Sequence, residues 1–241
     1  MSSVHGLEGH GGRKRRLGSL THQIVQDLGK AIVTGQFSEH NHFPIESEIC
    51  KRYDASRSIV REAIKVLNSK GMLVARPRRG TTVRPEKEWN LLDPDILYWM
   101  LNRRFSLTLL KDFTRARLAI EPAAAAEAAR TATDQQRQLM SDKLAGMRLA
   151  VDGKNDPLIA DIEFHLAILE ASNNPFFYSM SSMIETALRI SIRYTNRKLR
   201  QRVASYEEHD KLLAPILDRD PDGAAAESRA VLTRNLGLME A

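Results

Sequence analysis

Hydrophobic residues near the start of the chain recur every four positions, as they do along one face of a helix. Leu20, Ile24, Leu28 and Ile32 form this stripe, which predicts an amphipathic helix. Gly35 stands where the stripe stops, and because glycine commonly terminates helices, we expect the helix to end there.

Two shorter helices are predicted next. Pro44 begins the first of them, which ends near Tyr53. Ser56 is a favourable N-cap for the second, which covers residues 57–70 and keeps its apolar residues on one side. Gly71 follows as the expected C-cap.

A pair of short strands completes this part of the chain. Residues 72–76 and 81–84 predict two β segments, joined by the turn 77–80. The order of helix, helix, turn, helix and two-stranded wing predicts a winged helix-turn-helix domain over residues 18–85.

The third helix and the wing carry residues suited to DNA. Arg57 and Arg61 are four positions apart, so both project from one helical face. Arginine contacts guanine or phosphate, and the N-terminal end of a helix in the major groove reaches both. Arg79 and Gly80 in the wing turn suit the minor groove or its phosphates. The alternative for the helix arginines is a solvated face.

The rest of the chain has the composition of helices. A polar stretch and a helix capped by Asp93 form a linker and connecting helix over residues 86–104. From residue 105 to 241 the chain is rich in Ala, Leu, Glu and Arg, with breaks that divide it into about six helices. The predicted fold class is therefore mostly α, with an all-α bundle at the C-terminal end.

Composition narrows the class of protein. A chain of 241 residues with 42% hydrophobic residues can form two domains with real cores. Its single Cys excludes a disulfide scaffold. The lack of a signal segment or of an apolar run long enough for a bilayer leads us to expect a cytoplasmic protein without membrane contact.

The net charge of +6 is unevenly distributed. Residues 1–87 hold 16 Lys and Arg against 8 Asp and Glu, a net charge of +8, whereas residues 88–241 carry −2. Part of the excess lies in residues 1–17, which lack apolar periodicity and predict a disordered basic arm. The asymmetry is typical of a nucleic-acid reader joined to a different module.

The motifs of the first domain resemble the GntR family of bacterial transcription regulators. Pro44-x-Glu46-x-Glu48-Ile49, the run from Ser56 to Leu67, and Arg78-Arg79-Gly80-Thr81 carry the resemblance. It implies a winged helix that binds double-stranded operator DNA. The implied DNA contacts are Ser56, Arg57, Ser58, Arg61, Arg79 and Gly80, together with Ser47, where many relatives carry Arg.

The second domain offers candidate metal ligands. Asp161 and His165 are four positions apart, a spacing by which one helix supplies two ligands, although a solvent-facing pair has the same spacing. His209 lies at helical phase with apolar residues, where a surface histidine is the alternative.

A second resemblance covers residues 106–241. Arg117-x-x-x-Glu121-Pro122, Asp161-x-x-Phe164-His165 and Glu208-His209 are similar to the FCD ligand-binding domain of the FadR branch of the same family. This implies a divalent cation such as Zn²⁺ held by Asp161, His165, His209 and a fourth residue. Asn235 stands where a histidine is expected, and its carbonyl oxygen is a harder donor.

An arginine beside the cation would complete a site for a small carboxylate effector. Arg117 is the first candidate, with a salt bridge to Glu121 as its alternative, and Arg189 and Arg193 are the next. The segment from Trp89 to Leu101 is similar to the matching segment of regulators of galactonate and related sugar-acid operons.

The sequence therefore predicts a homodimeric repressor, not an enzyme, that releases its operator when a sugar acid such as galactonate binds. No His-Glu-x-x-His run or nucleophile motif is present. Two alternatives stay open: a metal-free regulator that responds to acyl-CoA, and a metal-dependent hydrolase with a DNA-binding appendage.

Overall fold

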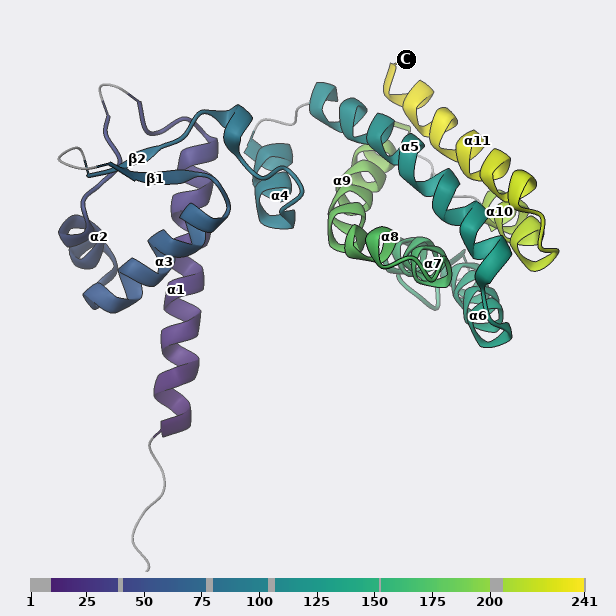
Figure 1. The fold of residues 1–241 in the computed structure, drawn as a ribbon, viewed down its shortest axis with the longest axis horizontal. Helices are drawn as coiled ribbons and strands as arrows, with labels where there is room; N and C mark the ends of the chain where they lie inside the picture. Colours follow the sequence, from purple (N-terminus) through teal and green to yellow (C-terminus); the bar gives the residue numbers. More distant parts are fainter. Residues whose placement is uncertain are drawn as a thin grey trace, which may run out of the picture. The chain divides into compact units, whose positions relative to one another are not determined.

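The computed structural model describes the backbone of residues 10–38, 41–76, 80–103, 107–151, 153–199 and 206–240 (Figure 1). The side chains of residues 10–19, 102, 103, 151 and 193–199 lie outside the described part. Two predicted site residues are affected, because Arg79 and the side chain of Arg193 are among those left out. The chain divides into two compact units, Met1–Arg104 and Phe105–Ala241.

The first unit is a helical domain with a small sheet (Figure 1). Its elements are α1 (His10–Val33), α2 (Glu46–Tyr53), α3 (Arg57–Ser69), β1 (Leu73–Arg76), β2 (Gly80–Val83), the 3₁₀ helix η1 (Glu86–Glu88) and α4 (Pro94–Arg103). β1 and β2 are antiparallel, with Leu73 opposite Val83. This order confirms the predicted helices and two-stranded wing.

Two helix starts differ from the prediction. α1 begins at His10, so residues 10–17 are helical rather than a disordered arm; their Arg and Lys residues favour helix. α2 begins at Glu46 rather than Pro44. Ile45 is extended and serves as the N-cap, and its backbone N–H donates to the Glu48 carboxylate at 3.1 Å, so the first turn starts after it.

The core of the first unit joins α1 to α3. Ile24 and Leu28 on α1 and Val60 and Leu67 on α3 are fully buried, as the apolar stripes predicted. Gly71 follows α3 with a φ of +78°, and a Cβ there would lie 2.7 Å from the Glu88 carbonyl oxygen. This close approach requires glycine, and it holds the chain after the wing against the end of α3.

The segment predicted as linker and connecting helix packs on the first unit. Trp99 of α4 is buried, and its Nε1 donates to Gln26 Oε1 of α1 at 2.8 Å. Lys70, at the end of α3, donates to Asp93 at 2.7 Å and to Asp95 at 2.9 Å. α4 is therefore attached to both α1 and α3.

The second unit is a bundle of helices, as predicted (Figure 1). Its helices are α5 (Leu107–Thr131), α6 (Asp134–Val151), α7 (Pro157–Ala171), α8 (Pro175–Ser179), α9 (Ser181–Leu199), α10 (Tyr206–Leu217) and α11 (Pro221–Glu240). The described residues of this unit thus form seven helices, whereas about six were expected. The additional one, α8, is a single short turn capped by Asn174, whose side chain accepts from the Phe176 N–H.

Small residues bring the bundle helices close together. Ala125, Ala128 and Ala129 of α5 and Ala224 of α11 are buried in one hydrophobic cluster with Phe164 of α7. α5 and α11 run side by side along much of their length (Figure 1). The alanine runs thus form tight helix contacts, and they fix α7 and α10 around the site described next.

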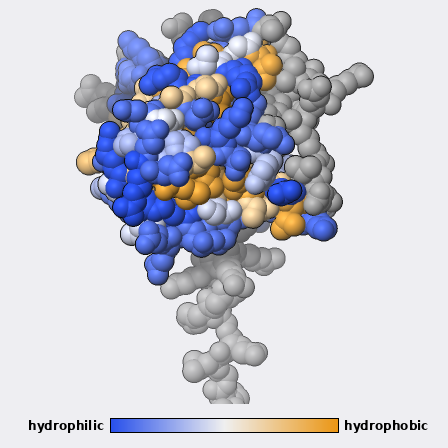
Figure 2. All heavy atoms as spheres, turned by 90° about the vertical axis from the view of Figure 1, so that its right-hand side faces the viewer, coloured by the Kyte–Doolittle hydropathy of each residue, from blue (hydrophilic) through white to orange (hydrophobic). Residues whose placement is uncertain are grey.

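The surface of the bundle is mixed in character. One face of the molecule shows hydrophobic residues gathered between larger hydrophilic areas (Figure 2). No helix in the described residues combines the length and the apolar composition that a membrane span needs.

Candidate functional site

The predicted recognition helix presents its polar residues to solvent. Ser56, Arg57, Ser58 and Arg61 are all exposed, whereas Val60 between them is fully buried. The hydroxyl oxygens of Ser56 and Ser58 lie 2.9 Å apart at the start of α3. One side of α3 therefore forms the core and the other is a continuous polar surface at the N-terminal end of the helix.

Arg61 has a partner that DNA can replace. Its Nε donates to Glu46 of α2 at 3.0 Å, but its side chain is 62% exposed. Exposed ion pairs contribute roughly 0.2–1 kcal/mol, so a phosphate or a guanine can compete with Glu46 for the guanidinium.

Two other predicted DNA contacts, Ser47 and Gly80, are also at the surface. Ser47 on α2 is exposed. Gly80 at the start of β2 is exposed with a φ of +71°, and no atom lies within 4 Å of the place where a Cβ would be. The wing can therefore approach another molecule closely through its backbone.

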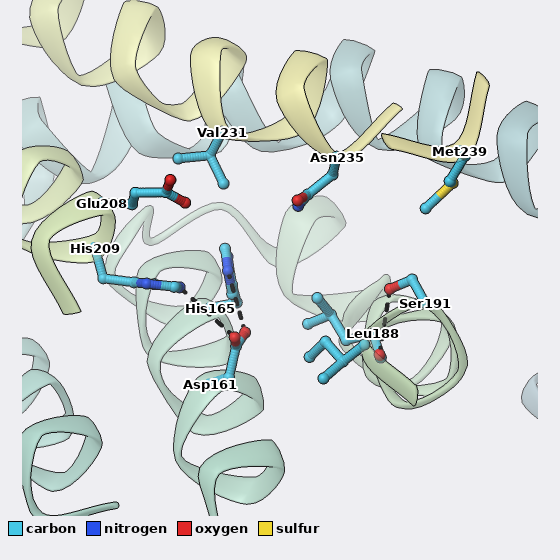
Figure 3. A pocket seen from close by; sticks show the side chains of 10 residues that line it. Asp161, His165, Leu188, Ser191, Glu208, His209, Val231, Asn235 and Met239 are labelled. Atoms are coloured by element: carbon cyan, nitrogen blue, oxygen red, sulfur yellow. Dashed lines mark hydrogen bonds and ion pairs between the residues drawn. The ribbon is translucent and has the colours of Figure 1, made fainter. Parts of the chain in front are cut away.

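The predicted metal ligands of the second unit converge. Asp161 and His165 of α7 and His209 of α10 are buried, and one donor atom from each lies within 4.8 Å of the others. His165 Nε2 is 3.5 Å from Asp161 Oδ1, and His209 Nε2 is 3.8 Å from Asp161 Oδ2 (Figure 3). The solvent-facing alternatives for this pair and for His209 are thus excluded.

These separations fit a transition metal. Donor atoms held at about 2.1 Å from a tetrahedral Zn²⁺ are roughly 3.4 Å apart. Two imidazoles and a carboxylate are donors that suit Zn²⁺ and other late first-row cations. Small side-chain movements would bring the three donor atoms to bonding distance, so the residues present fit a divalent cation.

Phe164 helps to fix the two histidines. Its ring is fully buried and meets the His209 ring edge to face, with centroids 5.2 Å apart. The His165 and His209 rings are 5.3 Å apart and also meet edge to face. The histidines are therefore packed in place by aromatic contacts as well as by Asp161.

A small cavity of about 20 Å³ adjoins the three ligands. Asn235 of α11 lines it, as predicted for the fourth position, and its amide points toward the ligand cluster (Figure 3). The remaining walls come from α9, α10 and α11 and are mainly apolar: Leu188, Ser191, Ile192, Glu208, Val231 and Met239. This volume is enough for about one water molecule or cation.

Arg117 is placed differently from the effector contact that was predicted. It is fully buried on α5 and does not line the cavity. Its Nε and Nη2 donate to the two carboxylate oxygens of Glu121 at 2.5 and 3.2 Å. The salt bridge considered as the alternative is thus the arrangement present.

Glu121 connects this ion pair to the metal ligands. Its Oε2 lies 3.5 Å from Nδ1 of His165, on the other side of the ring from Asp161. Burial alone would raise the pKa of Glu121, but the charge of Arg117 and the contact with His165 outweigh it and lower the pKa to about 2. Glu121 is therefore ionised at neutral pH.

The other predicted arginines do not reach the cavity through described contacts. Arg189 on α9 donates to Glu185 at 2.7 Å and is partly exposed, while its neighbour Leu188 lines the cavity. The side chain of Arg193 lies outside the described residues.

Sequence reasoning missed Glu208, which also lines the cavity. It precedes His209 on α10 and forms an ion pair with Arg234 of α11. Its position next to a candidate ligand was the available signal. That signal is weak, because a glutamate in the first turn of a helix is common for purely electrostatic reasons.

Comparison with known proteins identifies both units. Residues 20–83 match the family model of bacterial regulatory proteins of the gntR family, and residues 112–234 match that of the FCD domain. The galactonate operon transcriptional repressor of Escherichia coli K12 is 32% identical over 215 residues, covering 88% of this chain and 92% of that protein. The chain belongs to the GntR family.

Two further comparisons concern a relative in sequence and a solved structure that shares the fold. The transcriptional regulator YieP of E. coli K12 is 28% identical over 216 residues, covering 89% of this chain and 93% of that protein. A solved structure described as "Lar controls the expression of the Listeria monocytogenes agr system and mediates virulence" shares the fold, with a TM-score of 0.58, 13% identity and 99% coverage of both chains. These families are regulators and not enzymes, so this GntR protein with an FCD domain is a transcriptional regulator.

Proposed function

We propose that this GntR regulator is a repressor whose operator affinity is controlled by a small carboxylate, bound beside a divalent cation in the FCD unit. The observation that carries the proposal is the convergence of Asp161, His165 and His209 at a cavity in a unit joined to a DNA-reading domain. Such a buried donor set is costly to build without a ligand, because buried polar groups need partners.

The DNA-binding part of the proposal uses the polar face of α3. Arg57 and Arg61 would contact base edges and phosphates in the major groove, with Ser56 and Ser58 at the phosphates. Ser47, Gly80 and Arg79 would make the remaining backbone contacts from α2 and the wing. The exposure of the described residues in this set supports these roles.

The cation would be held by Asp161, His165 and His209, with Asn235 as the fourth protein donor. When bound, it supplies a Lewis-acidic centre that attracts carboxylate and hydroxyl oxygens. Asn235 provides a neutral oxygen in place of an imidazole, so the protein supplies fewer strong donors to the cation. Coordination positions therefore stay open for an effector.

We propose a sugar acid as the effector, with galactonate as the first candidate. The relative that is named a repressor of the galactonate operon supports this class. A sugar acid carries a carboxylate beside a hydroxyl, which together chelate a cation. The apolar alternative, an acyl-CoA, would need no metal and gains no support from the buried donor set.

The cavity size suggests how binding would be transmitted. A space of about 20 Å³ cannot hold a six-carbon acid, since small-molecule sites have volumes of roughly 300 Å³ or more. Binding would therefore favour a state in which α9 and α11 stand farther from α7. A ligand can shift DNA affinity only by its differential affinity for the two states, typically about 1–3 kcal/mol.

We further propose that the regulator acts as a homodimer on a pseudo-palindromic operator. Two copies of α3 would then read half-sites about one helical turn apart. Apolar side chains on the surface of the FCD unit, among them Leu139, Leu149 and Phe176, offer area that a second copy can cover.

A screen of sugar acids by thermal shift, with and without EDTA, tests the proposal. An effector that binds the native state raises the unfolding temperature, and chelation should remove that rise. Metal content by elemental analysis should be about one divalent ion per chain in the wild type and near zero in His165→Ala. A metal-free protein that responds to acyl-CoA would instead support the alternative.

A further inference from the structure

We propose that Glu121, held by Arg117, is a positioning residue for the metal ligand His165. The inference rests on the proposed cation site and deepens it, because it assigns a role to two buried residues that do not line the cavity. It also replaces the predicted function of Arg117 as a contact for the effector.

The His165 ring lies between two carboxylates, so that each ring nitrogen faces one of them. Nδ1 faces Glu121 at 3.5 Å and Nε2 faces Asp161 at 3.5 Å. A neutral imidazole has one N–H donor and one acceptor nitrogen. With Glu121 as an acceptor, the proton belongs on Nδ1, and the lone pair of Nε2 is directed at the cluster that Asp161 and His209 share.

Arg117 fixes Glu121 in this position. Both carboxylate oxygens of Glu121 accept from the Arg117 guanidinium, and the pair lies on α5 one turn apart. Both side chains are almost completely buried, at 2% and 7% exposure. Two hydrogen bonds from one guanidinium fix the orientation of a carboxylate, so Arg117 holds Glu121 against His165.

The result is a carboxylate–histidine–metal arrangement that spans α5 and α7. In such arrangements the carboxylate orients the ring, selects its tautomer and raises its basicity, and its loss typically costs about 10–100-fold in metal affinity. The ion pair would therefore tune metal binding from a distance. It also connects α5, which packs along α11, to the cavity that α11 lines.

The test is the Zn²⁺ and Ni²⁺ affinity of the full chain, measured by competition with a chromogenic chelator. The double variant R117M/E121M removes the whole ion pair, and replacing a buried pair with apolar residues of similar size often preserves the fold. It should bind metal roughly 10–100-fold more weakly than the wild type. E121Q, which retains an acceptor oxygen, should fall between the two.

The matched control is E127M/R130M, which removes an exposed Arg–Glu pair from the same helix, α5, and touches no residue of the proposed site. It should leave metal affinity unchanged. Circular dichroism confirms that each variant is folded, and long-range ¹H–¹⁵N spectra report the His165 tautomer without metal. The wild type should carry its proton on Nδ1, and R117M/E121M should shift toward the Nε2 tautomer.

The outcomes separate this inference from the proposed function. Wild-type protein that binds neither metal overturns the cation site itself. Wild-type protein that binds metal, with R117M/E121M equal to it in affinity and tautomer, overturns only the positioning role of Glu121. A misfolded R117M/E121M leaves the decision to E121Q, whose unchanged metal affinity would also contradict the proposal.

Discussion

At the scale of single residues, the cluster of candidate metal ligands shows how much the spacing of residues along a helix determines. Asp161 and His165 are one turn apart on α7, so their side chains lie on one face, and the sequence spacing alone predicted this. The spacing could not show that His209 comes to the same point from α10, because that contact depends on how the bundle packs. The resemblance to the FCD domain supplied it.

Asn235 is the residue at which this chain departs from the expected histidine, and its replacement is informative. Asn235→His would offer an imidazole to the cation in place of a neutral oxygen. We expect Zn²⁺ affinity to rise at least about tenfold, because imidazole is the better ligand for late transition metals. Chelator competition measures this.

The effector response supplies the control for that variant. If open positions on the cation serve the effector, Asn235→His should also weaken the thermal shift caused by the sugar acid. A variant with unchanged metal affinity would show that Asn235 does not face the cation.

At the scale of elements, the helix after the wing belongs to the DNA-reading unit. The sequence predicted residues 86–104 as a linker and connecting helix, and the composition of that stretch is indeed polar at its start. The structure shows Trp99 of α4 packed against Gly29 of α1 and Asp93 bound to Lys70. These are contacts between distant positions, which periodicity within one segment cannot reveal.

Gly29 provides a direct test of this packing. A Cβ at this position would lie 2.3 Å from the Trp99 ring, so Gly29→Ala must displace α4 or distort α1. We expect a loss of about 1–3 kcal/mol in the free energy of unfolding of this unit.

Gly146 on α6 is the matched control, since a Cβ added there would lie no closer than 3.6 Å to any other atom, in this case the Asn155 side chain. Gly146→Ala should be neutral or stabilise the chain by roughly 0.5–1 kcal/mol through helix propensity. Urea unfolding followed by circular dichroism, which reports the helices of both units, measures both. Equal stability of Gly29→Ala and the wild type would exclude the close contact.

The Lys70 ion pairs predict a pH dependence. Burial alone would lower the pKa of Lys70, but its hydrogen bonds and charge interactions with Asp93 and Asp95 raise it. A raised pKa in the folded state means that the stabilisation is fully present below the unfolded pKa of about 10.4 and is lost as the pH rises through the folded value.

Lys70→Met isolates this contribution. It should reduce stability by roughly 1–2 kcal/mol at pH 7. The difference from the wild type should shrink as the pH is raised above about 10.4, and urea titrations from pH 7 to 11 follow it. A difference that stays constant over this range would show that packing of the side chain, and not its charge, matters.

At the scale of the whole molecule, the charge asymmetry and the motifs of the first unit were enough to identify a DNA reader. The winged helix was predictable because its turns, caps and basic residues are local in sequence. The role of Arg117 was not, because a buried arginine and a ligand-binding arginine look alike until its burial and its partner Glu121 are known.

Because the proposed DNA contacts and the proposed metal ligands lie in different units, substitutions in one unit should not affect the binding function of the other. Arg57→Ala and Arg61→Ala should each weaken operator binding and lower the slope of log affinity against log salt by about 1 if they contact phosphate. Neither should change metal content or the effector thermal shift. Arg115→Ala, an exposed arginine on α5, serves as the control for general loss of charge.

In the proposed function, one chain couples a metal-dependent sugar-acid site to operator release. Fluorescence anisotropy of a labelled operator, titrated with wild-type protein with and without galactonate and with and without EDTA, tests it most directly. We expect galactonate to weaken operator binding roughly 5–150-fold, EDTA to remove this effect, and His165→Ala to bind the operator but no longer respond. Release of the operator by galactonate to the same extent in His165→Ala, or in EDTA, would contradict it.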